Sequence, residues 1–323
     1  MKSFYELEKL ELLIKNNPSL IKAEQLAQVP VGITELPVWG LTIGSSRPGL
    51  PVLALIGGIH GLEKVGSQAV LAFLHGLVNR LKWDKNYQTL LNEVTIISIP
   101  IVNPGGMLLH RRSNLNGVDL MRNAPQDAQE NIHFPVSGHR ISSHLPWYRG
   151  RQGDEMELES KALVQFCQRF TDQSPFVLSL DVHSGFGLHD RLWYPYGCYN
   201  KDFPDFDQFA RMYHAFSETF PYHVYKTESQ ADSYGIHGDL WDFITLENQR
   251  RHAHGTPPTL IPLTLELGSW RWVKKNPIQL LGKGGMFNPV KRHRYERTMR
   301  RHYHLFDFLL HACANYTFWE NDK

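Results

Sequence analysis

The chain has 323 residues, of which 42% are hydrophobic and 20% are charged. This length and composition allow a sizeable core, so they exclude general disorder and permit one large α/β domain or two ordinary ones. The formal net charge of +2 is too balanced to indicate a nucleic-acid or membrane partner.

Cysteine spacing and the first residues predict the compartment. Cys167, Cys198 and Cys313 are scattered without CxxC spacing, which favours a reducing compartment and argues against a disulfide framework. Residues 1–14 mix charged and apolar side chains and lack the uninterrupted apolar segment of a signal peptide, so we expect an amphipathic helix. No stretch approaches the roughly 18 apolar residues of a membrane-spanning helix. These features predict a soluble, cytoplasmic protein.

Residues 1–30 are predicted to form a helical lead-in, which is interrupted at Asn16-Asn17-Pro18 and ends near Pro30. Residues 31–323 would then form the main domain. Within it, residues 33–44 have the pattern of a pair of strands. We find no internal repeat, low-complexity tract or linker, so a single domain is expected.

Alternating apolar runs and helical patterns predict the fold class. The apolar runs are residues 51–56, 94–99, 176–182 and 259–265. Segments with helical spacing are residues 65–81, 154–170, 206–220, 239–246 and 295–316. This alternation is typical of an α/β fold with a mixed, mostly parallel, doubly wound sheet and helices on both faces. The polar, irregular stretch of residues 107–151 is long enough to indicate a functional loop.

Three of these apolar runs are followed by residues that could bind a metal. The first leads to His60 and Glu63, the third to His183, and the fourth to Glu266. Parallel strands bring these ends to one edge of a sheet, where ligands bind. Two imidazoles and a carboxylate with an open fourth position form the usual catalytic zinc site. A separate carboxylate could act as general base on water whose pKa the metal lowers towards about 7.

Each of these residues also has a structural interpretation. His183 could be a core histidine bonded to backbone, and Glu266 an ion-paired strand terminus. Three strand ends that all carry such residues are much harder to explain by chance, so we expect a site.

The segment 111–123 adds arginines near the same edge of the sheet. Arginine can stabilise the oxyanion that develops on a scissile carbonyl. It can also bind a substrate carboxylate through its forked N–H groups. Arg111 could equally belong to a solvated basic loop.

Five stretches resemble, in order, the zinc metallocarboxypeptidase family of the carboxypeptidase A type. They are residues 58–63, 103–106, 112–123, 181–183 and 264–266, and the resemblance spans about residues 50 to 270. The short spacing from Arg112 to Arg122 is most similar to compact bacterial members such as the murein peptide amidases. The resemblance implies a zinc carboxypeptidase-like catalytic domain over residues 31–323.

The family pattern implies a role for each residue of the metal centre. His60, Glu63 and His183 would bind one zinc ion per chain, and Glu266 would be the general base. Asp119 would fix the tautomer of His60, as ligating histidines generally require.

The family pattern also implies a substrate site. Arg112 would polarise the scissile carbonyl, and Arg122 would bind the terminal carboxylate together with its neighbours Met121 and Asn123. The family normally has Asn at the position of Met121, so one amide donor is lost here.

Two further positions carry alternatives. Tyr234, four residues before Gly238, would be the tyrosine that caps the substrate, although an alignment on Trp241 would put Asp232 there. Asp239 could make the specificity pocket negative and favour basic side chains, or it could cap the following helix.

We therefore expect a zinc hydrolase that cleaves a terminal amide bond of a peptide or amide substrate, with cell-wall peptide as one option. Nucleic acid and membrane are not expected as partners. One alternative is a desuccinylase-like deacylase of small N-acyl amino acids. Another is a non-catalytic zinc- or peptide-binding module.

Overall fold

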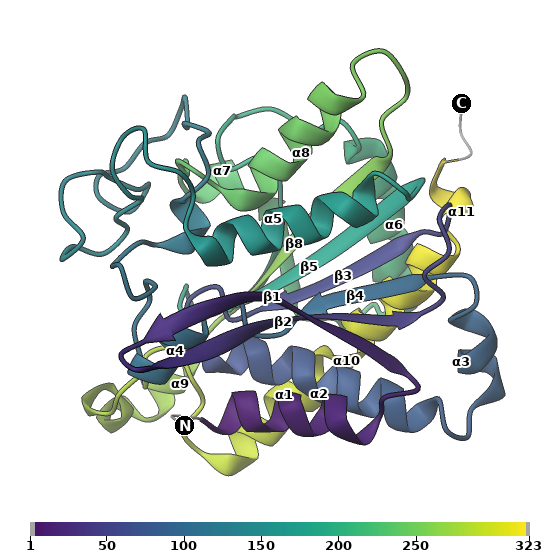
Figure 1. The fold of residues 1–323 in the computed structure, drawn as a ribbon, viewed down its shortest axis with the longest axis horizontal. Helices are drawn as coiled ribbons and strands as arrows, with labels where there is room; N and C mark the ends of the chain where they lie inside the picture. Colours follow the sequence, from purple (N-terminus) through teal and green to yellow (C-terminus); the bar gives the residue numbers. More distant parts are fainter. Residues whose placement is uncertain (1–3, 321–323) are drawn as a thin grey trace.

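An eight-stranded mixed sheet runs through residues 4–320, the part of the chain that the computed structural model describes (Figure 1). The strand order is β1-β2-β4-β3-β5-β8-β6-β7. The strands are β1 (Ile21–Val31), β2 (Thr34–Gly44), β3 (Val52–Gly57), β4 (Thr95–Ile99), β5 (Phe176–Ser184), β6 (Asp190–Tyr194), β7 (Tyr225–Ser229) and β8 (Thr259–Leu267). The central strands β4, β3, β5 and β8 are parallel, whereas β2 and β6 join them antiparallel. The predicted α/β fold with a mixed, mostly parallel sheet is confirmed.

The central strands are buried on both faces. Every residue of β3, β4 and β5 is buried. In β3, Leu53 and Leu55 enter the core on one face, and Val52, Ala54 and Ile56 enter the core on the other. Helices that cover both faces of a parallel sheet account for such continuous apolar runs.

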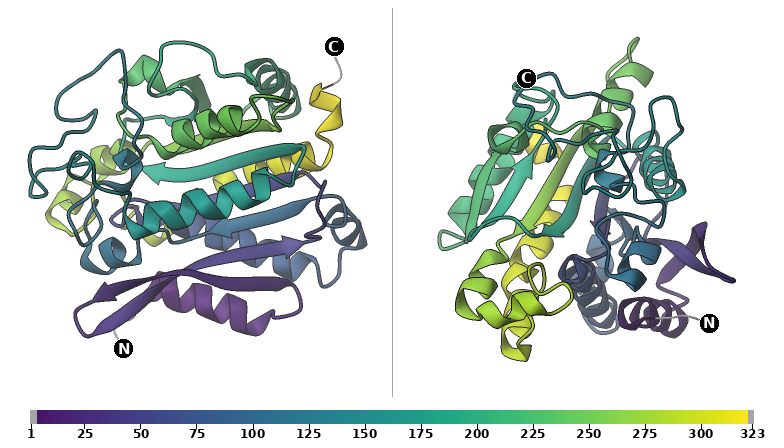
Figure 2. Two further views of the ribbon diagram at one scale, coloured as in Figure 1. Left: turned by 45° about the horizontal axis from the view of Figure 1, so that its top comes forward. Right: turned by 90° about the vertical axis from the view of Figure 1, so that its left-hand side faces the viewer.

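Two helical layers cover the sheet, as the views in Figures 1 and 2 show. One core contains side chains of α1 (Tyr5–Asn16), α2 (Lys64–Arg80), α6 (Phe206–Thr219) and α10 (Arg292–Ala314). The other contains side chains of α5 (Leu158–Thr171) and α8 (Leu240–Arg251). The shorter helices are α3 (Lys85–Leu90), α4 (Pro104–Leu109), α7 (Gln230–Ser233), α9 (Trp270–Lys275) and α11 (Thr317–Glu320), with 3₁₀ turns η1 (Leu120–Arg122) and η2 (Pro277–Leu281).

The N-terminal segment differs from its prediction. Within the described residues the helix ends at Asn16, and residues 21–31 form β1 instead of a helix. Residues 34–44 form one strand and not two, and they pair with β1 through a two-residue turn at Gly32 and Ile33. Residues 21–28 are rich in Lys, Ala, Glu, Gln and Leu, which favour helix, but pairing along β2 overrides this local preference. A boundary at residue 30 stays a prediction.

The amphipathic character of the first helix is confirmed, because Leu7, Leu10 and Leu13 are buried. The helix expected from Asp154 begins only at Leu158. The irregular stretch that precedes it lies at one end of the sheet (Figure 2). In residues 4–320 no helix is both long enough and apolar enough to span a membrane.

Candidate metal centre and substrate cavity

The turn after β3 brings His60 and Glu63 to the edge of the sheet. Gly58 has φ +68°, a conformation that glycine adopts readily. A Cβ on Gly61 would lie 2.2 Å from the carbonyl carbon of Gly106, so this turn can pack against the start of α4 only with glycine. Glu63 then directly precedes α2.

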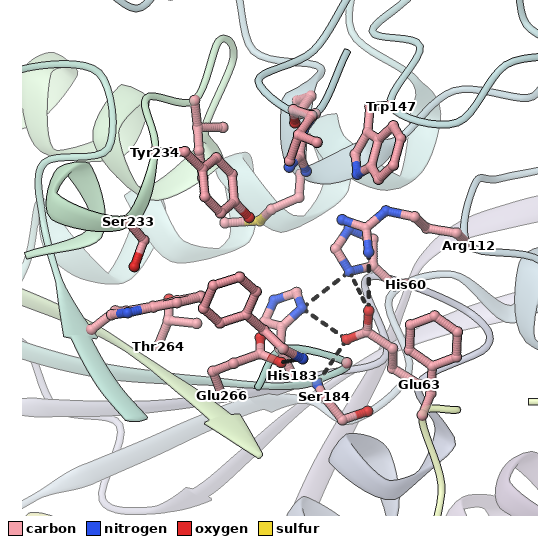
Figure 3. Close-up of a pocket in the computed structure, with 18 of the residues that line it drawn as sticks. His60, Glu63, Arg112, Trp147, His183, Ser184, Ser233, Tyr234, Thr264 and Glu266 are labelled. Atoms are coloured by element: carbon pink, nitrogen blue, oxygen red, sulfur yellow. Dashed lines mark hydrogen bonds and ion pairs between the residues drawn. The ribbon is translucent and has the colours of Figure 1, made fainter. Parts of the chain in front are cut away.

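His183 and Glu266 reach the same edge from neighbouring strands. They are partners in the register of β5 and β8. The structure therefore brings together the four residues that the strand ends predicted, as Figure 3 shows.

Three ligand atoms converge at this edge. Nδ1 of His60 lies 2.9 Å from Oε1 of Glu63, and Nδ1 of His183 lies 3.1 Å from Oε2 of Glu63. The two Nδ1 atoms are 3.1 Å apart. All three side chains are buried, and they form a group that could hold a metal ion.

Two aspartates set the protonation of these imidazoles. Nε2 of His60 lies 3.0 Å from Oδ1 of Asp119, and Nε2 of His183 lies 2.8 Å from Oδ2 of Asp181. A carboxylate accepts only, so each Nε2 carries a proton, and Nδ1 is the nitrogen of each ring that is left to bind a metal.

Such an arrangement of acceptors fits a cation. Two nitrogens bound to a tetrahedral zinc at 2.0–2.1 Å would lie about 3.3 Å apart, close to the spacing of the two Nδ1 atoms. Glu63 is held in place independently, because Oε2 also accepts from the backbone N–H of Ser184 at 2.9 Å. The donor set and its spacing therefore suit zinc.

The electrostatics of His183 and Glu63 agree with this. Burial favours the neutral form of His183, but the charges of Asp181 and Glu63 outweigh it and raise the pKa of His183 well above its usual value. Burial likewise disfavours the Glu63 carboxylate, but His60 and His183 more than offset it, and the pKa of Glu63 is lowered. The carboxylates thus favour a positive charge where the ligand atoms meet, which a bound cation would supply.

Glu266 is the fourth buried residue of the group. Its Oε1 accepts from the backbone N–H of Phe186 at 2.9 Å. Burial and the negative charge of Glu63 raise the pKa of Glu266 to about 8. A cation held by Glu63 would offset that charge and favour the carboxylate form of Glu266.

One carboxylate joins both arginines of the predicted substrate site. Oδ2 of Asp119 accepts from Nε of Arg112 at 2.8 Å and from Nη1 of Arg122 at 3.2 Å. Arg112 also donates to Oε1 of Glu63 at 3.2 Å. Arg122 donates through Nε to the carbonyl of Val136 at 2.9 Å, and its buried Nη2 has no partner among the described residues. A buried donor without a partner is available for a ligand acceptor.

A cavity of about 710 Å³ opens over these residues. It is lined by His60, Glu63, Arg112, Met121, Arg122, Trp147, His183, Phe186, Tyr234, Asp239, Thr264, Glu266, Trp270 and Phe287, among others. Tyr234 lines it, whereas the alternative Asp232 is exposed outside the lining.

Asn123 does not line this cavity, contrary to its predicted role. Its Nδ2 donates to the carbonyl of Arg149 at 3.2 Å, and its Oδ1 accepts from the backbone N–H of Glu157 at 2.6 Å. The amide is used to hold the irregular loop against the start of α5. Met121 does line the cavity, so the position without an amide donor faces that space.

Asp239 caps the helix that follows it, and it also lines the cavity. Its Oδ1 accepts from the backbone N–H groups of Trp241 and Asp242 at 2.9 and 3.0 Å, which caps α8. The same side chain lines the cavity. Burial and the nearby Asp242 raise the pKa of Asp239 to about 8.

Two residues that shape the centre were given no role by sequence. Asp181 lies two residues before His183, a spacing that puts both side chains on one face of a strand. That spacing could have indicated Asp181 as the partner of His183. Asn288 clamps the turn around Glu63: Oδ1 accepts from Val65 N at 2.9 Å, and Nδ2 donates to the carbonyl of Leu62 at 2.8 Å. It lies more than 200 residues away, and no sequence pattern indicates the contact.

The chain is similar to known proteins in sequence and in fold. A family model described as zinc carboxypeptidase matches residues 8–283. Carboxypeptidase SOL1 of Arabidopsis thaliana is 24% identical over 281 residues, which cover 80% of this chain and 49% of the relative. The chain thus spans about half the length of that curated relative.

Two solved structures share the fold. Carboxypeptidase A from Helicoverpa armigera has a TM-score of 0.69 and 19% identity, covering 95% of this chain and 71% of that one. The other is a metallocarboxypeptidase from Pseudomonas aeruginosa, solved in complex with (2-guanidinoethylmercapto)succinic acid. It has a TM-score of 0.55 and 17% identity, and the match covers 94% of this chain and 68% of that one.

The family match confirms the resemblance inferred from the sequence, together with the expectation of a metallopeptidase family and of zinc as its metal. The chain belongs to the zinc carboxypeptidase family.

Proposed function

We propose that the chain is a zinc-dependent metallocarboxypeptidase that hydrolyses a terminal amide bond of a peptide. His60, Glu63 and His183 are the proposed zinc ligands. The observation that carries the proposal is the convergence of their three ligand atoms, with each Nε2 held by a carboxylate, at the base of a large cavity. When bound there, zinc supplies a Lewis acid that polarises a carbonyl and lowers the pKa of water.

Glu266 is the proposed general base. It takes a proton from the attacking water as the water oxygen bonds to the carbonyl carbon. It then delivers a proton to the leaving nitrogen as the C–N bond breaks. Burial and the Glu63 charge raise its pKa, and a cation bound by Glu63 would offset that charge and favour the carboxylate that a base needs.

Arg112 is proposed to stabilise the oxyanion. Asp119 and Glu63 hold its guanidinium at the edge of the cavity through Nε and Nη1. A guanidinium has five N–H donors, so donors remain for the oxygen on which charge develops. Because Arg112 is already fixed, little reorganisation is needed when the charge appears.

Arg122 is proposed to bind the substrate's terminal carboxylate. Its unpartnered Nη2 is the donor available for it. Tyr234, on the cavity wall, would close over the bound substrate.

Asp239 is proposed to favour a basic side chain at the substrate's C-terminus. It is a buried acid on the cavity wall, and a guanidinium or ammonium would relieve the charge that burial disfavours there. The guanidinium-bearing ligand of the Pseudomonas aeruginosa structure has this chemistry.

Met121 favours a second candidate, a peptide amidase acting on substrates such as cell-wall peptides. The residue lines the cavity beside Arg122 but offers no amide to a terminal carboxylate. A substrate whose carboxylate lies elsewhere would lose less from that substitution. In either case we propose a cytoplasmic location, supported by three cysteines that are buried and free.

A substrate panel tests these candidates. Peptides with a free C-terminal Arg, Leu or Glu, their C-terminal amides, murein tripeptide and N-succinyl amino acids are incubated with protein that has been depleted of metal or loaded with zinc. The proposal predicts zinc-dependent release of C-terminal Arg, with Leu and Glu slower. Cleavage confined to the murein tripeptide would support the amidase, and cleavage confined to N-succinyl amino acids would support the deacylase. No cleavage with zinc bound would support a binding module.

A further inference from the structure

The first half of α10 concentrates positive charge. Between Arg292 and His304 the chain has five arginines and one glutamate, although its overall net charge is only +2. Arg297 and Arg301 follow Arg294 by three and seven residues, a spacing that puts all three on one face of the helix. Like charges three or four residues apart destabilise a helix, so this stripe needs a compensating interaction.

A cavity of about 290 Å³ lies along this stripe, between α9 and α10. It is lined by Arg271, Trp272, Lys275, His293, Arg294, Arg297, Thr298 and Arg301. Figure 2 shows the segment that contains α9 beside the start of α10. Arg294 joins the two elements by donating to the carbonyls of Trp272 at 3.1 Å and Lys275 at 3.4 Å. The wall of the cavity is therefore held in place.

Acidic groups do not balance this cavity. Asp190, fully buried, pairs with Arg271 and lies 3.3 Å from Nε of Arg301. Arg297 and Lys275 make no ion pair with any residue in the range 4–320. The positive charges of the lining thus outnumber the one carboxylate paired with them.

Burial and repulsion act together on Arg301. Burial lowers its pKa, and the charges of Arg271 and Arg297 lower it further, while Asp190 raises it. A bound anion would relieve this repulsion.

A second, apolar cavity of about 550 Å³ adjoins the first. Its lining includes Phe216, Phe220, Tyr222 and Tyr225, together with Arg297 and Arg301, which also line the basic cavity. Neither cavity shares a lining residue with the substrate cavity. Two arginines therefore stand between a basic chamber and an aromatic one, away from the proposed active site.

We propose that these two cavities form a binding site for an organic phosphate. The phosphate would lie among Arg271, Arg297 and Arg301, whose forked N–H groups suit its oxygens. The apolar or aromatic part of the ligand would lie against Phe220 and Tyr222. The site is independent of the proposed peptidase function.

Isothermal titration with phenyl phosphate, at fixed ionic strength and on the zinc-loaded full chain, tests the proposal. We expect one saturable site per chain, and weaker binding of inorganic phosphate, which has no ring for the apolar chamber. Arg297→Gln should weaken phenyl phosphate binding at least tenfold. Arg292→Gln is the matched control, because Arg292 is on the same helix but lines neither cavity, and it should change affinity less than twofold. Tyr222→Ser should weaken phenyl phosphate more than inorganic phosphate.

Two results would overturn the proposal. One is the absence of saturable binding. The other is an equal effect of Arg297→Gln and Arg292→Gln, which would indicate unspecific charge attraction or binding in the substrate cavity. Vesicles that contain phosphatidic acid distinguish the source of the phosphate: sedimentation with vesicles that phenyl phosphate reverses, and that Arg297→Gln abolishes, supports a lipid headgroup. Titration without sedimentation supports a free organic phosphate.

Discussion

Asp119 holds His60 and also the two cavity arginines. Its Oδ1 lies 3.0 Å from Nε2 of His60, while Oδ2 accepts from Arg112 and Arg122. One buried carboxylate thus couples the proposed metal ligand to the groups proposed to bind substrate. Burial opposes its charge, but Arg112, Arg122 and His60 outweigh burial and hold the pKa of Asp119 well below its usual range.

Replacing this carboxylate should weaken zinc binding and destabilise the fold. For Asp119→Asn we expect a 10- to 100-fold loss of zinc affinity, as is usual when a histidine's outer partner is removed. Because buried Arg122 would lose the one carboxylate with which it pairs among residues 4–320, we expect unfolding to become easier by about 3 kcal/mol. Competition with a zinc chelator and urea unfolding measure the two effects. Zinc affinity within twofold of the original protein would contradict the role assigned to Asp119.

Asn288 should act on zinc through the position of Glu63. Asn288→Ala removes the clamp on Leu62 and Val65 and the bond to the carbonyl of Gly284. We therefore expect about tenfold weaker zinc binding and a stability loss of about 2–4 kcal/mol, the value of three hydrogen bonds. Asn288→Asp keeps the acceptor for Val65 N, so its zinc affinity and stability should lie between those of the original protein and Asn288→Ala. Asn315→Ala, an exposed helix-end amide, is the control. If Asn288→Ala lowers stability but leaves zinc affinity unchanged, Asn288 does not position the ligand.

Zinc affinity should fall as the pH falls. The raised pKa of His183 favours a second proton, on Nδ1, when no cation is bound. Zinc needs the Nδ1 lone pair, so that proton must leave on binding. We expect the dissociation constant to rise about tenfold per unit of pH lowered for each proton released. Titration calorimetry in two buffers of different ionisation enthalpy counts these protons, and a count of zero between pH 6 and 8 would refute the prediction.

Asp239 should make stability fall with rising pH. Its pKa is about 8 in the folded chain, above the usual 3.8, so folding binds a proton that the unfolded chain releases. This contribution to stability is fully present below about pH 4 and is lost as the pH rises through about 8. Asp239→Asn keeps a capping oxygen without the charge. Relative to the original protein, its free energy of unfolding should increase from pH 5 to pH 8.

Asp84 is a control for that experiment, because its pKa is shifted in the opposite direction. It caps α3 through Asn86 N and Tyr87 N, and its hydrogen bond with Arg80 lowers its pKa. Asp84→Asn should therefore lose stability relative to the original protein above the usual aspartate pKa. The same pH trend in both variants would argue against the assignment for Asp239.

The proposed metal site could be located from sequence because its residues follow apolar runs. A parallel sheet brings such ends to one edge, so His60, His183 and Glu266 could be grouped without coordinates. The same residues predicted zinc as the metal and the zinc carboxypeptidase family.

The features that the sequence did not predict depend on long-range packing. Residues 21–31 carry helix-favouring side chains, and only their pairing with β2 makes them a strand. Asn123 adjoins the cavity residue Arg122 in sequence, yet the loop turns its amide towards Arg149 and Glu157. Asn288 and the two cavities along α10 depend on contacts between segments far apart in the chain, for which a single sequence gives no signal.

The most direct test of the account compares the original protein with Glu266→Gln, both loaded with zinc. The measurement is kcat/KM for a peptide with a free C-terminal Arg, with zinc content determined on the same samples. We predict about one zinc per chain in both proteins and a loss of at least about 1,000-fold in kcat/KM for Glu266→Gln, since it can no longer take the proton. Hydrolysis by Glu266→Gln within tenfold of the original rate, with zinc bound, would contradict the proposed mechanism.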